Sequence, residues 1–156
     1  MENILIVEEK DFSKIKEKIE KNKDKKIILP FSNEELARKA LDKLKIDVLL
    51  VNLSKNKDKL KERGSSFNQV LSRLCKKANV KLGINLNEII NSETKEKAEI
   101  IARINQNVKI SKKAELEIAF ILKKENKRSL YDLKSLALVL GVNTKTTKNL
   151  EIIYFE

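Results

Sequence analysis

The side chains that most often carry catalysis are scarce in this sequence. It has no histidine and a single cysteine, Cys75, so the commonest general base is missing and neither a thiolate zinc site nor an internal disulfide can form. Cys75 lies on an apolar helical stripe, which predicts core packing. Glu8, Glu9 and Asp11 follow the first expected strand and are the best magnesium candidates, although solvated acids are the more common interpretation of such a group.

Lysine and arginine are the abundant functional groups. They number 34 against 23 aspartates and glutamates, which gives a formal net charge of +11 at pH 7. An excess of this size attracts polyanions, and nucleic acid is the commonest polyanion in a cytosol. The composition therefore predicts a nucleic-acid partner, with a merely solvated lysine-rich surface as the alternative.

Two segments concentrate this positive charge. The first spans residues 52–66 and the second residues 123–129, and their cations are Lys55, Lys57, Lys59, Lys61 and Arg63, then Lys123, Lys124, Lys127 and Arg128. No aromatic side chains are interleaved with these cations, so the segments lack a platform for stacking unpaired bases. They suit recognition of a phosphate backbone, and hence a structured RNA recognised by shape.

Two other functions can be set against RNA binding. Residues 133–150 have the small residue, glycine and turn of a helix-turn-helix, but Thr147 stands where a packing residue is expected. A free-standing DNA- or RNA-binding protein is therefore the first alternative. An enzyme for a small anionic substrate is the second, although neither of the glycine-rich phosphate-binding motifs is present.

The apolar pattern predicts a single α/β domain over residues 1–156. Short β-branched runs at 3–7, 26–29, 47–51, 81–84, 116–122 and 152–155 alternate with amphipathic stretches, which is typical of a parallel sheet. We expect Pro30 to close the second strand. Capping boxes at Ser32 and Ser66 should open two helices, a long helix should cover 93–114, and another should run from Ser129 to Gly141.

The expected elements also place the basic segments. A closed eight-stranded barrel normally needs about 250 residues, so the prediction is a reduced, incomplete TIM-like barrel or an open parallel sheet. Both basic segments follow strands, and loops that leave parallel strands emerge at one edge of the sheet. We call the two segments together the basic rim. No apolar run approaches the roughly 20 residues that cross a bilayer, which predicts a cytoplasmic protein without a membrane partner.

Residues 61–88 carry a family resemblance. A stretch with an arginine and a glycine leads into a helix of the form N-x-V-L followed by an alanine, and then into a strand ending in Gly-Ile. The residues in these places are Arg63, Gly64, Asn68, Val70, Leu71, Ala78, Val80, Gly83 and Ile84. Arg38 and Asp47 match upstream. Arg103 with Asn107, Arg128 with Ser129 and Asp132, and the Leu-Gly-Val of residues 140–142 match downstream. Over about residues 26–150 the chain resembles the barrel-like protein subunit of archaeal and eukaryotic ribonuclease P, protein component 3.

The resemblance implies a function for the whole chain. It implies a non-catalytic RNA-binding subunit that supports RNA-catalysed removal of the 5′ leader from precursor tRNA, within an endoribonuclease whose chemistry belongs to the RNA. The implied partners are the catalytic RNA, precursor tRNA within the particle and at least one other protein subunit. No cofactor is implied beyond the magnesium held by that RNA. The sequence departs from the family at residues 123–127 and is shorter at its N-terminus.

Overall fold

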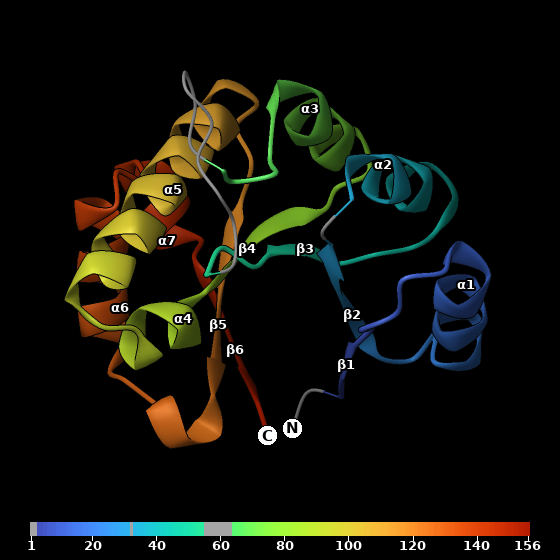
Figure 1. The fold of residues 1–156 in the computed structure, drawn as a ribbon, viewed down its shortest axis with the longest axis horizontal. Helices are drawn as coiled ribbons and strands as arrows, with labels where there is room; N and C mark the ends of the chain where they lie inside the picture. The colour runs from blue at the N-terminus through green and yellow to red at the C-terminus, as the bar shows by residue number, and fades with distance from the viewer. Residues whose placement is uncertain (1–2, 32, 55–63) are drawn as a thin grey trace.

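The fold is an alternation of strands and helices around one curved parallel sheet (Figure 1). The computed structural model describes residues 3–31, 33–54 and 64–156. Its sheet has 6 strands in chain order, β1 to β6, and every neighbouring pair is parallel. The strands are β1 Ile4–Ile6, β2 Lys26–Phe31, β3 Val48–Val51, β4 Lys81–Asn85, β5 Ile118–Lys123 and β6 Glu151–Phe155. The predicted α/β class and parallel order are confirmed.

Helices cover the convex side of the sheet. They are α1 Phe12–Lys21, α2 Glu34–Lys43, α3 Gln69–Lys77, α4 Leu86–Asn91, α5 Thr94–Lys113, α6 Leu130–Val139 and α7 Thr144–Lys148, with a short 3-10 helix η1 at Lys124–Asn126. The main core lies between them and the sheet. A second, smaller cluster fills the concave side and consists of Ile28, Val48, Leu50, Ala119, Ile121 and Ile153. Apolar packing on both faces explains why strands such as β3 are buried along their full length.

The barrel is incomplete on one side. The outer strands β1 and β6 are the two edges of the sheet, and Figure 1 shows them facing each other across an opening beside the two chain termini. Residues of both strands, including Ile4, Ile6 and Tyr154, line a groove of about 630 Å³. The sheet is therefore a nearly closed, TIM-like barrel with an open seam.

Pro30 lies inside β2 rather than at its end, which corrects the sequence prediction. The backbone N–H of Lys26 donates to Asn3 and the carbonyl of Ile28 accepts from Val7, so the even-numbered residues of β2 direct their backbone groups toward β1. The ladder between β1 and β2 ends at Ile28. The missing N–H of Pro30 therefore faces a position without a partner strand, and the proline costs no sheet hydrogen bond.

Two predicted helix caps are shifted along the chain. Asn33 caps α2 by accepting from Glu35 and Leu36, whereas the predicted cap Ser32 lies outside the described residues. Asn68 caps α3 through the N–H of Leu71 at 2.9 Å, while Ser66 adopts a left-handed backbone with φ 57°. The caps predicted around α6 are confirmed. Ser129 accepts from the N–H of Asp132 at 3.1 Å, and Gly141 follows the helix with φ 93°.

A charged cluster closes the end of the barrel where the strands begin. Glu151 forms ion pairs with Lys26 and with Lys81, the latter at 3.0 Å, and Lys81 also lies 3.3 Å from Glu117. Burial alone would raise the pKa of Glu151, but hydrogen bonds and charge from Lys26 and Lys81 outweigh it, so the pKa is lowered. For Lys81, burial would lower the pKa, and the two carboxylates outweigh it, so its pKa is raised.

Replacing Glu151 with glutamine should lower the free energy of unfolding near pH 7 by about 1–3 kcal/mol, because Lys26 and Lys81 each lose an ion-pair partner, although Lys81 keeps Glu117. The pKa of Glu151 is lower in the native state than in the unfolded state. Its contribution to the free energy of unfolding is therefore complete above the unfolded-state pKa and disappears as pH falls through the native-state pKa. Urea unfolding between about pH 3 and pH 7 should therefore show a flatter pH dependence for the variant. Glu20→Gln removes an exposed carboxylate 3.9 Å from Lys16 and is the control; equal losses in both variants would contradict this role.

Candidate nucleic-acid interface

The starts of the two basic segments are joined at one edge of the sheet. Asn85, the last residue of β4, donates from Nδ2 to the Oδ1 of Asn52 at 3.1 Å, and its own Oδ1 accepts from the Nδ2 of Asn87 at 2.9 Å. The Oδ1 of Asn87 in turn accepts from the backbone N–H of Lys123 at 3.0 Å and from Asn126 at 2.9 Å. This chain of amides ties together the ends of β3, β4 and β5.

The segment after β5 presents its cations on an ordered turn. Lys123, Lys124, Lys127 and Arg128 are all exposed. The Arg128 guanidinium donates to the carbonyls of Asn126 and Lys127 at 3.1 Å each, and the carbonyl of Arg128 accepts from the hydroxyl of Tyr154 at 3.2 Å. Lys124 forms an ion pair with Glu156, which leaves Lys123 and Lys127 as the better-exposed charges for a phosphate.

The segment after β3 is anchored at both of its described ends. The carboxylate of Glu88 accepts from the backbone N–H groups of Leu53 and Ser54 at 2.9–3.1 Å. Arg103 donates to the carbonyl of Leu53 at 2.9 Å, and Gln106 donates to the hydroxyl of Ser65 at 2.9 Å. The cations of this segment, Lys55, Lys57, Lys59, Lys61 and Arg63, lie outside the described residues.

A small polar cavity lies beside these anchors. It has a volume of about 280 Å³ and is lined by Ser54, Asn85, Asn87, Glu88, Asn91, Ser92 and Glu96. The cavity presents amides, hydroxyls and carboxylates, which form hydrogen bonds.

The thiol of Cys75 lies in the core, and burial raises its pKa to about 12, as its place on an apolar stripe predicted. Of the three acids after β1, Glu9 forms an ion pair with Lys18 at 2.5 Å.

Several of the residues that carry the family resemblance have structural roles. Asn68 and Ser129 are helix caps. Arg103 is 3% exposed and anchors Leu53, and Asn107 lies one turn later on the same buried face of α5. Arg38 is on the outside of α2, where it pairs with Glu34. Asp132 contributes its backbone N–H to the α6 cap.

The helix-turn-helix interpretation meets a short second helix. After Gly141 the chain forms α7, which has only 5 residues, and then enters β6. Thr147, at the position of the missing packing residue, is 5% exposed, and its hydroxyl donates to the carbonyl of Asn143 at 2.8 Å. A recognition helix must lie along the major groove, and α7 offers about 7.5 Å of helix, so it is too short to do so.

The sequence reasoning missed the amide chain and Glu88. All four amides and the carboxylate lie within a few residues of a strand end, and the asparagine-rich run 85–91 directly after β4 is the signal that was available. Asparagines at that position can join neighbouring loops when the strands are parallel, because their carboxyl ends share one edge.

Comparison with known proteins adds a structural likeness. No family model matches the sequence, and the search of curated proteins gives no match. The fold is similar to a chain in a cryo-EM structure of archaeal ribonuclease P with mature tRNA, with a TM-score of 0.73 and 20% sequence identity. The match covers 92% of this chain and 62% of that chain, so this chain spans less than two thirds of its length. Among the described residues, no helix is long and apolar enough to cross a membrane.

Proposed function

We propose that the chain is a non-catalytic RNA-binding protein subunit of ribonuclease P, which supports RNA-catalysed removal of the 5′ leader from precursor tRNA. The observation that carries the proposal is the structural likeness over 92% of the chain to a component of an archaeal ribonuclease P structure. The sequence resemblance over about residues 26–150 supports protein component 3 as the particular subunit.

The charge distribution supports RNA as the direct partner. Lys123, Lys127 and Arg128 stand exposed at the carboxyl edge of the sheet, and the anchors Glu88 and Arg103 hold Leu53, near the start of the first basic segment, at the same edge. Cations without stacking aromatics bind phosphates and recognise a folded RNA by shape. The catalytic RNA would supply the magnesium, and the particle would work in the cytoplasm.

An apolar helix face supports a protein partner in addition. The outer side of α6 exposes large apolar side chains, among them Tyr131 at 85% and Val139 at 81%, together with Leu130 and Leu138. A cluster of this kind is typical of the centre of a protein–protein interface. It suits the further protein subunit that the proposed particle contains.

Capture of the tagged chain from the cells that make it, followed by RNA sequencing, tests the proposal. The expected result is one abundant structured RNA together with 5′-extended tRNA precursors, because both would belong to the same particle. Recovery of mixed messenger RNA or of broad genomic DNA would contradict the proposal and favour a free-standing nucleic-acid-binding protein. As a second readout, depletion of the chain should increase the amount of 5′-extended precursor tRNA.

A further inference from the structure

The surface charge of this protein is segregated between its helices. On α1 and α2, lysines and arginines alternate with acids and form pairs one turn apart: Lys16 with Glu20, Lys21 with Glu17, and Arg38 with Glu34. Helix α3 contains no acid, and neither does the part of α5 from residue 100 to its end. These two helices expose Arg73, Lys76, Lys77, Lys109, Lys112 and Lys113, which we call the basic ridge.

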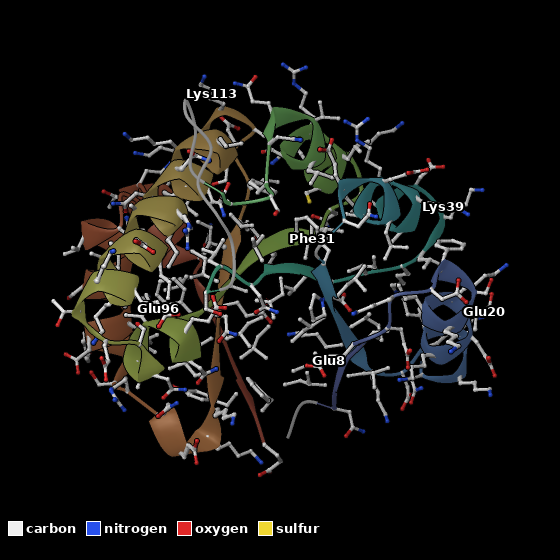
Figure 2. The ribbon with its side chains drawn as sticks, in the orientation of Figure 1. Glu8, Glu20, Phe31, Lys39, Glu96 and Lys113 are labelled. Atoms are coloured by element: carbon white, nitrogen blue, oxygen red, sulfur yellow. The ribbon has the colours of Figure 1, made fainter. Side chains whose placement is uncertain are left out.

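The basic ridge is one continuous surface. The hydroxyl of Ser72 on α3 donates to the carbonyl of Ile110 on α5 at 3.5 Å, and Lys76 reaches the carbonyl of Glu115, just beyond α5, at 3.1 Å. Figure 2 shows Glu96 and Lys113 at opposite ends of α5, with Lys113 at the end near α3. Each helix contributes two cations four residues apart, Arg73 and Lys77 on α3 and Lys109 and Lys113 on α5. The cations of each pair are separated by about 6 Å along the helix axis.

Helix stability alone does not account for this arrangement. Lys76, Lys77, Lys112 and Lys113 are in the last turns of their helices, where a cation complements the helix dipole. Arg73 and Lys109, however, each lie one turn earlier, and like charges four residues apart destabilise a helix. Within the residues that the structure describes, no carboxylate lies within ion-pair distance of any of the six cations. A surface of this kind is therefore suited to binding an anionic partner molecule.

We propose that the basic ridge is a second RNA-binding surface, which holds the phosphate backbone of helical RNA. Helical RNA is recognised through its phosphates and 2′-hydroxyls without inserted aromatics, and all but one of the ridge cations are lysines. Lysine is depleted from protein–protein interfaces. The exposed large apolar side chains lie elsewhere, mainly on α6, with Val70 in the first turn of α3.

The ridge and the described cations of the basic rim, Lys123, Lys124, Lys127 and Arg128, lie at opposite ends of the fold. Helices α3 and α5 run from the carboxyl edge of the sheet back to the edge where β4 and β5 begin, so their last turns are distant from the turn after β5. The 20 residues of α5 span about 30 Å. The protein therefore contacts RNA at two separated places. This inference shares its class of partner with the proposed function but rests on different residues.

The test compares two quadruple variants that remove equal charge. R73Q/K77Q/K109Q/K113Q neutralises the ridge, and K14Q/K23Q/K43Q/K45Q neutralises four exposed lysines on and around α1 and α2. The probe is an RNA hairpin with a stem of about 16 base pairs, and binding is measured by fluorescence anisotropy over a range of salt concentrations. We expect the ridge variant to lose at least about tenfold in affinity and to flatten the slope of log affinity against log salt by about 3, because each lost phosphate contact contributes about 0.7–0.9.

The outcomes separate the ridge from the rim. The inference is overturned if the ridge variant and the control have the same hairpin affinity and the same salt slope. Polyglutamate is measured as a polyanion that is not RNA, and a ridge variant that loses polyglutamate binding but keeps its hairpin affinity also overturns the inference. K123Q/K127Q/R128Q is measured on the same hairpin. A loss in this rim variant alone also overturns the ridge proposal while leaving the proposed function intact. A loss in the ridge variant alone supports the ridge and removes the rim from the proposed function. Thermal melting should show that the stability of the ridge variant is close to that of the wild type, because the relief of like-charge repulsion offsets the loss of Lys77 and Lys113 from the last turns of their helices.

Discussion

Replacing Gly83 with alanine should destabilise the protein by about 2–3 kcal/mol, and valine should cost more, because the barrel interior has no room for a side chain there. A Cβ on Gly83 would lie 2.7 Å from Val48 Cγ1 and 3.2 Å from atoms of Ile121 and Leu50. All three neighbours belong to the interior cluster on β3 and β5. Strand β4 pairs with β3 on one side and with β5 on the other, so it cannot move outward without breaking both ladders. Urea unfolding measures the change.

A compensating substitution checks the cause. Val48→Ala removes the atom closest to the added Cβ, so V48A/G83A should be more stable than the sum of the two single effects predicts. Gly141→Ala is the control, because there the nearest atom, Val108 Cγ1, is 3.9 Å away and only the φ of 93° opposes the change. If G83A unfolds like the wild type, or if Val48→Ala brings no recovery, the interior is not packed as described.

The architecture was predictable because the strands are buried on both faces. Val48–Val51 is an unbroken apolar run with helix-forming sequence on either side, and such runs indicate a parallel sheet. The helix starts were less predictable. Ser32 and Asn33 are both good capping residues, and the backbone path into α2 decides between them. Helix α4 has only 6 residues, too few to show a helical period, and it was not predicted.

The candidate interface was predictable only in part. Parallel topology alone places the starts of the segments after β3 and β5 at one edge, and the amide chain joins Asn52 to Lys123 there; the cations of the first segment lie outside the described residues, so their place remains a prediction. The basic ridge was not predicted, because Arg73 and Lys109 are far apart in the sequence and meet only when α3 packs against α5. Residues matched to the family, such as Asn68 and Arg103, proved to be caps and anchors, so the resemblance carried information about the fold more than about a binding site.

Neutralising the basic rim should weaken RNA binding strongly with little effect on stability. K123Q/K127Q/R128Q removes three exposed cations from the turn after β5 and spares Lys124, which is paired with Glu156. K59Q/K61Q/R63Q removes three from the segment after β3, which lies outside the described residues. For precursor tRNA or the catalytic RNA, each variant should flatten the salt dependence by about 2, since each lost phosphate contact contributes about 0.7–0.9 to the slope. Thermal unfolding of K123Q/K127Q/R128Q should barely change, because these side chains are exposed and substitutions of exposed residues usually alter stability by less than about 0.5 kcal/mol.

The combined variant distinguishes one site from two independent ones. If both segments hold the same stretch of RNA, removing all six cations should abolish measurable specific binding, because neither half retains enough contacts to position the RNA. K23Q/K43Q/K45Q carries the same charge change as either triple variant, on exposed positions at the opposite edge of the sheet, where β2 and β3 begin. It should keep most of the affinity and the original salt slope. A control that weakens binding as much as the rim variants would mean that the RNA responds to net charge alone, and the carboxyl edge of the sheet would then not be a binding site.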